Sequence, residues 1–189
     1  VPAEHRISLG EGNTPLIRSR KIGPAAGLEN LFFKLEGGNP AGSFKDRFAC
    51  AAVSGMLASG RRRCIATSSG NTGAALAAYT AAAGIECHIA IVETAPLSKL
   101  KQMLVYGANI FRITGFGLDP DVSEVAFGEL QRMGGREDSA VQISAYHFSR
   151  TGMTGVPTLA HELAEQAERP LDHVCAPAGG GGLCVGLAR

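Results

Sequence analysis

The chain has 189 residues, of which 45% are hydrophobic and 19% are charged, and its 18 basic and 17 acidic residues leave a formal net charge of +1. A nearly neutral chain with dispersed charges lacks the basic surface that nucleic acids and anionic membranes attract, and no stretch approaches the ~18 apolar residues of a membrane span. We therefore expect no nucleic-acid or membrane partner, and a small-molecule ligand instead.

The cysteines are odd in number and form no C-x-x-C pair, and each lies in an apolar stretch: Cys50, Cys64, Cys87, Cys175 and Cys184. This pattern predicts buried free thiols in a reducing compartment, with neither disulfides nor a metal site. The first residues also lack the apolar segment of a signal peptide. We expect a cytoplasmic protein.

Strands and helices alternate along most of the chain. Leu31–Glu36 reads as the first clear strand, and a helix follows from Lys45. The later expected strands are Cys64–Thr67, Glu86–Val92, Asn109–Thr114, Ala140–Ser144 and His173–Ala176, and the helices between them are Ala74–Ala83, Leu97–Tyr106, Asp121–Met133 and Pro157–Ala167. This order predicts a parallel sheet with right-handed crossovers. Strands that are apolar on both faces, such as Glu86–Val92, indicate helices on both sides of the sheet.

We expect an α/β fold, a three-layer sandwich around this parallel sheet. Residues 54–144 are predicted to form a small α/β domain. Residues 1–53 and 145–189 are predicted to belong to a larger, incomplete domain, with the ligand between the two.

Lys45 is the residue best suited to covalent chemistry. In the run G-S-F-K-D-R, Ser43 and Asp46 have the spacing of a helix N-cap and its reciprocal acid, which places Lys45 in the first helical turn. The helix dipole there disfavours an ammonium, and burial against Phe44 and Phe48 lowers the lysine pKa further. A partly neutral lysine is a nucleophile that can form a Schiff base with a carbonyl. Taken alone, the stretch also fits a solvated lysine paired with Asp46.

Two loops at the carboxyl ends of expected strands are candidates for ligand binding. The first contains Ser68, Ser69, Gly70, Asn71 and Thr72, whose hydroxyls, amide and helix-start N–H groups suit a carboxylate and a ligand oxygen. The alternative is a polar N-cap without a ligand.

The second loop consists of Gly179, Gly180, Gly181 and Gly182, whose backbone amides could close around a phosphate. It is no Walker A loop, because no Lys-Ser or Lys-Thr follows. Cys184 occupies the last glycine position of the dinucleotide fingerprint, so a phosphate monoester fits better than a nucleotide.

A lysine nucleophile, an asparagine and a phosphate loop together fit pyridoxal 5'-phosphate as the cofactor. The motifs E-G-N-T-P-L from Glu11, G-S-F-K-D-R, S-G-N-T from Ser69 and the glycine loop resemble, in this order, fold-type II pyridoxal-phosphate enzymes. The chain looks most like threonine synthases, and the resemblance covers nearly all of it. It implies a tryptophan-synthase-beta-like architecture of which the C-terminal half is missing.

The resemblance also implies residue roles. Lys45 would carry the Schiff base and act as general base, Asn71 would face the cofactor's 3-hydroxyl, and Gly179 to Gly182 would hold its phosphate. Ser68, Ser69, Gly70, Asn71 and Thr72 would receive the carboxylate of an amino-acid substrate.

The implied activity is that of an amino-acid lyase of the threonine synthase type, which converts O-phosphohomoserine to threonine by elimination and hydration. The Gly-Gln-Lys-Thr run of that family is missing before Gly155, so a serine or threonine dehydratase, or another elimination or replacement enzyme, remains an alternative. A truncated, non-catalytic module that binds amino acids or phosphate is a further alternative.

Three other residues carry weaker signals. Arg150 is a candidate for binding a substrate phosphate, although a lone loop arginine is more often solvated. His147 is either a general acid or a structural residue, and His88 is expected to be packed or exposed at an edge.

The chain stops at Arg189, shortly after the glycine loop, and the residue that contacts the pyridine nitrogen in the family would lie beyond it. An unpaired strand His173–Ala176 would then leave a sheet edge open. We expect the chain to form homo-oligomers or to associate with its missing half, and to lack full lyase activity alone.

Overall fold

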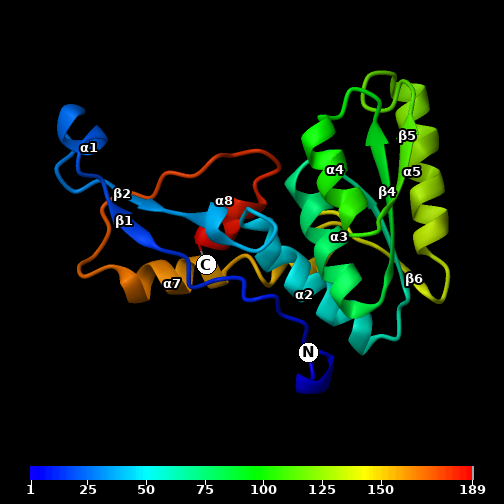
Figure 1. The fold of residues 1–189 in the computed structure, drawn as a ribbon, viewed down its shortest axis with the longest axis horizontal. Coiled ribbons are helices and arrows are strands. Elements are labelled where there is room, and N and C mark those ends of the chain that lie inside the picture. Colours follow the sequence, from blue (N-terminus) through cyan, green and yellow to red (C-terminus); the bar gives the residue numbers. More distant parts are fainter. Residues whose placement is uncertain (189) are drawn as a thin grey trace.

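Four parallel strands form the central sheet of the computed structural model, which describes residues 1–188 (Figure 1). They run in the order β5-β4-β3-β6. The strands are β3 (Arg63–Thr67), β4 (Glu86–Val92), β5 (Asn109–Ile113) and β6 (Ser139–Val141), and the helices that connect them are α3 (Asn71–Ala83), α4 (Leu97–Val105) and α5 (Pro120–Gly134). We call residues 63–141 the sheet unit.

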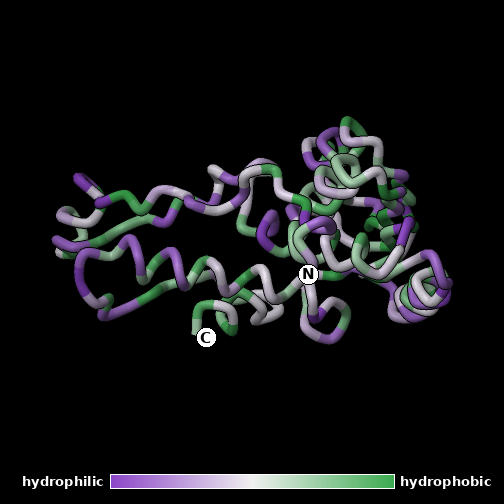
Figure 2. Tube along the Cα trace, turned by 90° about the horizontal axis from the view of Figure 1, so that it is seen from below, coloured by the Kyte–Doolittle hydropathy of each residue, from purple (hydrophilic) through white to green (hydrophobic). Residues whose placement is uncertain are grey.

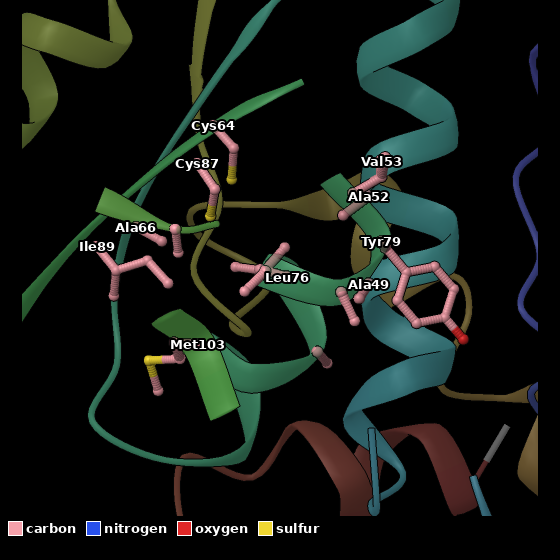
Figure 3. Close-up of a cluster of buried hydrophobic side chains, with 14 of the residues drawn as sticks. Ala49, Ala52, Val53, Cys64, Ala66, Leu76, Tyr79, Cys87, Ile89 and Met103 are labelled. Atoms are coloured by element: carbon pink, nitrogen blue, oxygen red, sulfur yellow. The ribbon is translucent and has the colours of Figure 1, made fainter. Parts of the chain in front are cut away.

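Helices cover both faces of this sheet, as its apolar strands predict. On one face, Cys64, Cys87 and Ile89 pack against Leu76 of α3 in the main core, where the two cysteine side chains lie side by side (Figure 3). On the other face, a smaller cluster joins Ile65 and neighbouring strand residues to α5. The predicted parallel sheet with helices on both sides is therefore confirmed.

The remaining elements extend to one side of the sheet unit (Figure 1). Two short strands pair in antiparallel fashion, and Figure 2 shows this extension from below with hydrophobic segments along its length. The elements outside the sheet unit are 3-10 helices Ala3–His5 and Glu36–Gly38, strands β1 (Leu16–Arg18) and β2 (Phe32–Lys34), and helices α1 (Ile22–Ala25), α2 (Lys45–Ala58), α6 (Arg150–Met153), α7 (Thr158–Gln166) and α8 (Gly182–Leu187). We call residues 14–36 and 158–188 the arm.

Helix α2 joins the two parts. Its buried face packs against α3 and α6, and the main core includes Phe48, Ala49, Ala52 and Val53. The glycine at position 155 allows the segment after α6 to approach α2 closely, since a Cβ there would lie 1.9 Å from the Arg47 carbonyl oxygen. The domain boundary predicted between residues 53 and 54 falls inside this continuous helix, and the division into domains stays a prediction.

A polar network holds the arm to α2. The Arg47 guanidinium donates to Glu36 at 2.8 Å and to Glu162 at 2.6 Å, and Lys34 Nζ donates to Glu162 at 2.7 Å. The Arg47 and Lys34 side chains are only 2% and 9% exposed. The hydrogen bonds from Arg47, before those from Lys34, lower the pKa of Glu162 to about 2. These contacts connect β2, α2 and α7.

The predicted strand His173–Ala176 is wrong. Residues 172–177 form no strand in the structure. A strand needs a neighbour for its backbone N–H and C=O groups, and within residues 1–188 none runs beside this segment. The open sheet edge expected there is therefore also absent from residues 1–188.

The burial of each cysteine depends on the part of the fold in which it lies. All five are free, and Cys64 and Cys87 are buried as expected, whereas Cys175 is exposed because its segment packs into no sheet. Among residues 1–188, no helix is long and apolar enough to cross a membrane. The cytoplasmic location and the oligomeric state stay predictions.

Candidate active site

Lys45 is the first residue of α2, and its amine is partly withdrawn from water. Nζ donates a hydrogen bond to Ser144 Oγ at 2.6 Å and lies 4.8 Å from the centroid of the Phe44 ring. Burial lowers the pKa of Lys45, the direction that its sequence context predicts. Within residues 1–188 no carboxylate pairs with this amine. The alternative of a solvated Lys45 paired with Asp46 is therefore wrong.

Asp46 instead organises the turn before Lys45. Its carboxylate accepts hydrogen bonds from the backbone N–H of Ala41 at 2.7 Å and of Ser43 at 3.3 Å. The reciprocal acid of the predicted cap is thus present. The N-cap is Phe44 and not Ser43, because the helix begins at Lys45, one residue later than the cap at Ser43 would place it. The Ser43 hydroxyl still accepts a hydrogen bond from the Lys45 N–H at 3.2 Å. Burial raises the pKa of Asp46, although its backbone donors oppose this shift.

The strand order creates a switch point beside this lysine. From β3 the chain crosses first toward β4 and β5, and then returns to place β6 on the other side of β3. In open parallel sheets, ligands bind outside the carboxyl ends of the two strands where the direction reverses. Ile65 pairs with Val141 at the end of the β3–β6 ladder, and Ser68 and Ser144 each follow three residues later, so both come after the carboxyl ends of neighbouring strands.

The S-S-G-N-T loop lies at this edge, between β3 and α3. Gly70 is the N-cap of α3, which makes Asn71 and Thr72 part of its first turn, three residues before the predicted helix start. The Ser68 hydroxyl accepts from the Gly70 N–H at 3.2 Å, while Asn71 is exposed. A side chain at Gly73 would collide with the Ser68 carbonyl oxygen, at 2.6 Å. The loop therefore places the first turn of α3 and the exposed Asn71 at the carboxyl end of β3.

The glycine loop begins α8. A Cβ added at Gly179, Gly180 or Gly181 would meet no atom within 4 Å. Gly181 has φ +77°, in the left-handed region that glycine favours, and serves as the N-cap of α8. The three glycines thus border open space, which leaves their backbone amides accessible to a ligand.

Met153 connects the glycine loop to the lysine. A Cβ at Gly182 would lie 2.6 Å from Met153 Cε, and the Ser144 hydroxyl is 3.9 Å from Met153 Sδ. Ser144 in turn accepts the hydrogen bond from Lys45. The amine and the glycine loop are therefore linked through two side chains, and this arrangement fits a compact ligand with a carbonyl at one end and a phosphate at the other.

Ser144 is a site residue that sequence reasoning missed. It lies at the end of the expected strand Ala140–Ser144 and belongs to no motif. Its relation to Lys45 depends on β6 lying next to β3, which the strand order along the chain does not reveal. The one indication in the sequence that Ser144 lies at the site is that this polar residue stands at the end of an expected strand.

The three weaker candidates, Arg150, His147 and His88, differ in their surroundings. Arg150 starts α6 and is exposed, and its neighbour Thr151 lies against Gly55, ten residues along α2 from Lys45, or about 15 Å. It therefore lies far from the lysine. His147 is exposed and stacks edge-on against Phe148. His88 is half-buried and stacked on a strand neighbour, so its packed interpretation is confirmed.

Known proteins share both sequence and fold with this chain. A threonine synthase from Halalkalibacterium halodurans is 46% identical over 58% of this chain and 31% of its own length. A threonine synthase from Bacillus sp. (strain ULM1) is 36% identical over 93% of this chain and 47% of its own length. The chain thus spans about a third to a half of the length of these curated relatives.

Solved structures give the same architecture with more varied activities. Maize serine racemase superimposes with a TM-score of 0.77 at 30% identity, over 93% of this chain and 50% of its own. A pyridoxal 5'-phosphate-dependent aspartate racemase gives a TM-score of 0.77 at 28% identity, over 92% of this chain and 51% of its own. These neighbours confirm the expected tryptophan-synthase-beta-like α/β fold.

The family match covers residues 7–189 and is described as pyridoxal-phosphate dependent enzyme. The cofactor of this family is pyridoxal 5'-phosphate, and the lysine, the edge loops and the open glycine loop have the chemistry to hold it. The chain belongs to the pyridoxal-phosphate dependent enzyme family.

Proposed function

We propose that this chain is part of an amino-acid lyase of the threonine synthase type, in which Lys45 binds pyridoxal phosphate covalently. The observation that carries the proposal is the environment of Lys45, whose half-buried amine has a hydroxyl partner 2.6 Å away and a pKa lowered by burial. The cofactor supplies an aldehyde for the lysine and a ring that withdraws electrons from the substrate's Cα.

The chain's own residues have separate tasks in this proposal. Ser144 would orient the Lys45 amine, which would hold the cofactor's aldehyde covalently with loss of water and, once an incoming amino group displaces it, would serve as the general base at Cα. Gly179 to Gly182 would hold the phosphate through backbone N–H groups, and Asn71 would face the ring hydroxyl. The residues from Ser68 to Thr72 bind the substrate carboxylate. Threonine synthase is favoured because that is the name of both relatives described above.

The first test is covalent trapping. Borohydride reduction in the presence of pyridoxal phosphate should label the peptide that contains Lys45, and Lys45→Ala should abolish the label. Lys99→Ala is the matched control, because Lys99 lies on α4 and contacts Gln102 at 3.3 Å. Labelling of Lys34 or Lys99 in the parent chain would overturn the assignment. Labelling of Lys45 without turnover of any amino acid would favour the non-catalytic binding module.

The position of Arg150 favours a second candidate function. Its neighbour Thr151 lies against Gly55, which is about 15 Å from Lys45 along α2, so Arg150 is poorly placed to bind a substrate phosphate at the lysine. A serine or threonine dehydratase uses the same lysine without such a phosphate site. Release of inorganic phosphate from O-phosphohomoserine supports the first function, whereas formation of a 2-oxo acid from serine or threonine supports the second.

A further inference from the structure

A hollow lies beside the C-terminal half of α2. It has a volume of about 480 Å³ and is bounded by the C-terminal half of α2, the end of α5, β6 and the start of α6. Met56 and Phe148 provide apolar wall, while Ser59 and Gln131 provide polar groups. A hollow of this size accommodates a small organic molecule.

The charged side chains that line the hollow are all arginines. Among the residues that line it, Arg61 and Arg150 carry the formal charges and no acidic side chain is present. Within residues 1–188 the Arg150 guanidinium has no hydrogen bond or ion pair, so all of its donors are available. Arg61 Nη1 donates to the carbonyl oxygens of Arg136 and Glu137, which fixes this side chain against the loop before β6.

The hollow is separate from the candidate active site. Thr151 of α6 lies against Gly55, and Gly155 lies against the carbonyl of Arg47, so α6 and α2 run in opposite directions. The start of α6 is therefore next to the last turns of α2, about 15 Å from Lys45. A ligand here would neither touch the lysine nor compete with the glycine loop.

We propose that this hollow binds a small organic oxyanion, with its phosphate or carboxylate group held by Arg150 and Arg61 and its carbon skeleton against Met56 and Phe148. Arginine pairs with both groups through two parallel hydrogen bonds. The inference is independent of the proposed function, because it uses none of the residues assigned to the cofactor.

The test uses inorganic phosphate as the probe, with acetate in a parallel series to separate phosphate from carboxylate preference. Phosphate binding is measured by calorimetry on the full chain in a buffer without other oxyanions, with and without saturating pyridoxal phosphate. With saturating pyridoxal phosphate present, so that the glycine loop is occupied, we expect one saturable phosphate site whose affinity falls at least about tenfold in Arg150→Gln. Without the cofactor, the glycine loop is expected to add a second phosphate site.

Arg20→Gln is the matched control, because Arg20 is an exposed arginine of the arm. It should leave phosphate affinity unchanged. Arg61→Gln changes the second arginine of the lining and should also weaken phosphate binding, and thermal unfolding of each variant establishes that it is folded. Equal phosphate affinity in Arg150→Gln and the parent chain, or complete displacement of phosphate by pyridoxal phosphate, would overturn the proposal.

Discussion

The sheet unit and the arm are stabilised in different ways. In α3 every residue from Gly73 to Thr80 is buried, and the adjoining strands supply apolar side chains to the same core. In the arm neither β1 nor β2 has a buried residue, and Ile17 and Phe33 remain 47% and 39% exposed. The arm combines a few buried apolar residues of α7, Leu159 and Leu163, with the ion pairs of Glu162 with Arg47 and Lys34. The proposed cofactor site draws on both regions.

The largest effect on unfolding free energy is expected from truncation in the sheet unit. Leu76 is fully buried in the main core, so Leu76→Ala should destabilise the chain by about 3 kcal/mol through lost burial and a cavity. Leu28→Ala is the same change in the arm, where the side chain is 54% exposed, and should cost less than about 0.5 kcal/mol. Urea unfolding of both variants measures the difference, and equal losses would contradict the contrast between the regions.

An intermediate effect is expected from breaking the polar network. Glu162→Gln leaves the buried Arg47 and Lys34 charges with a neutral partner. We expect a loss of about 2 kcal/mol, below the ~3–5 kcal/mol of a fully buried pair, because Glu162 is partly solvated. Glu165→Gln, one turn away on the exposed surface of α7, is the control and should change little.

Acid titration sharpens this prediction. The folded-state pKa of Glu162 is about 2, below the ordinary value of 4.5, so its stabilising contribution is complete above about pH 5. That contribution is lost as the pH falls from about 5 toward 2. The difference in unfolding free energy between the parent and Glu162→Gln should therefore shrink over this range. A constant difference would assign the effect to packing and not to charge.

The smallest effect on stability is expected at the glycine loop. A Cβ added at Gly180 meets no neighbour within 4 Å, so Gly180→Val should change the unfolding free energy by less than about 0.5 kcal/mol. The same side chain would occupy the space of a bound phosphate, and affinity for pyridoxal phosphate should fall at least about tenfold. Gly37→Val, another glycine in open space, is the control. Unchanged cofactor affinity in a titration would refute the phosphate role.

Local patterns predicted much of the sheet unit. The strand Glu86–Val92 has the bounds that its apolar run indicates, because Cys87, Ile89 and Ile91 are buried on one face and Ala90 is buried on the other. The turn before Lys45 could also be predicted, because Asp46 accepts hydrogen bonds from backbone N–H groups no more than five residues away. Ser144 and the failed strand His173–Ala176 depend on which segments lie next to each other, and no local pattern carries that information.

The hydrogen bond between Lys45 and Ser144 joins residues 99 positions apart in the chain. Strands β3, β4 and β5 can pair through successive crossovers, whereas β6 must return past them to reach β3. Contacts that close long loops form late and slow the folding of a chain. We therefore expect the contact with Ser144, and the burial that lowers the pKa of Lys45, to form at the end of folding, after the main core. A newly synthesised chain would then acquire its reactive lysine last.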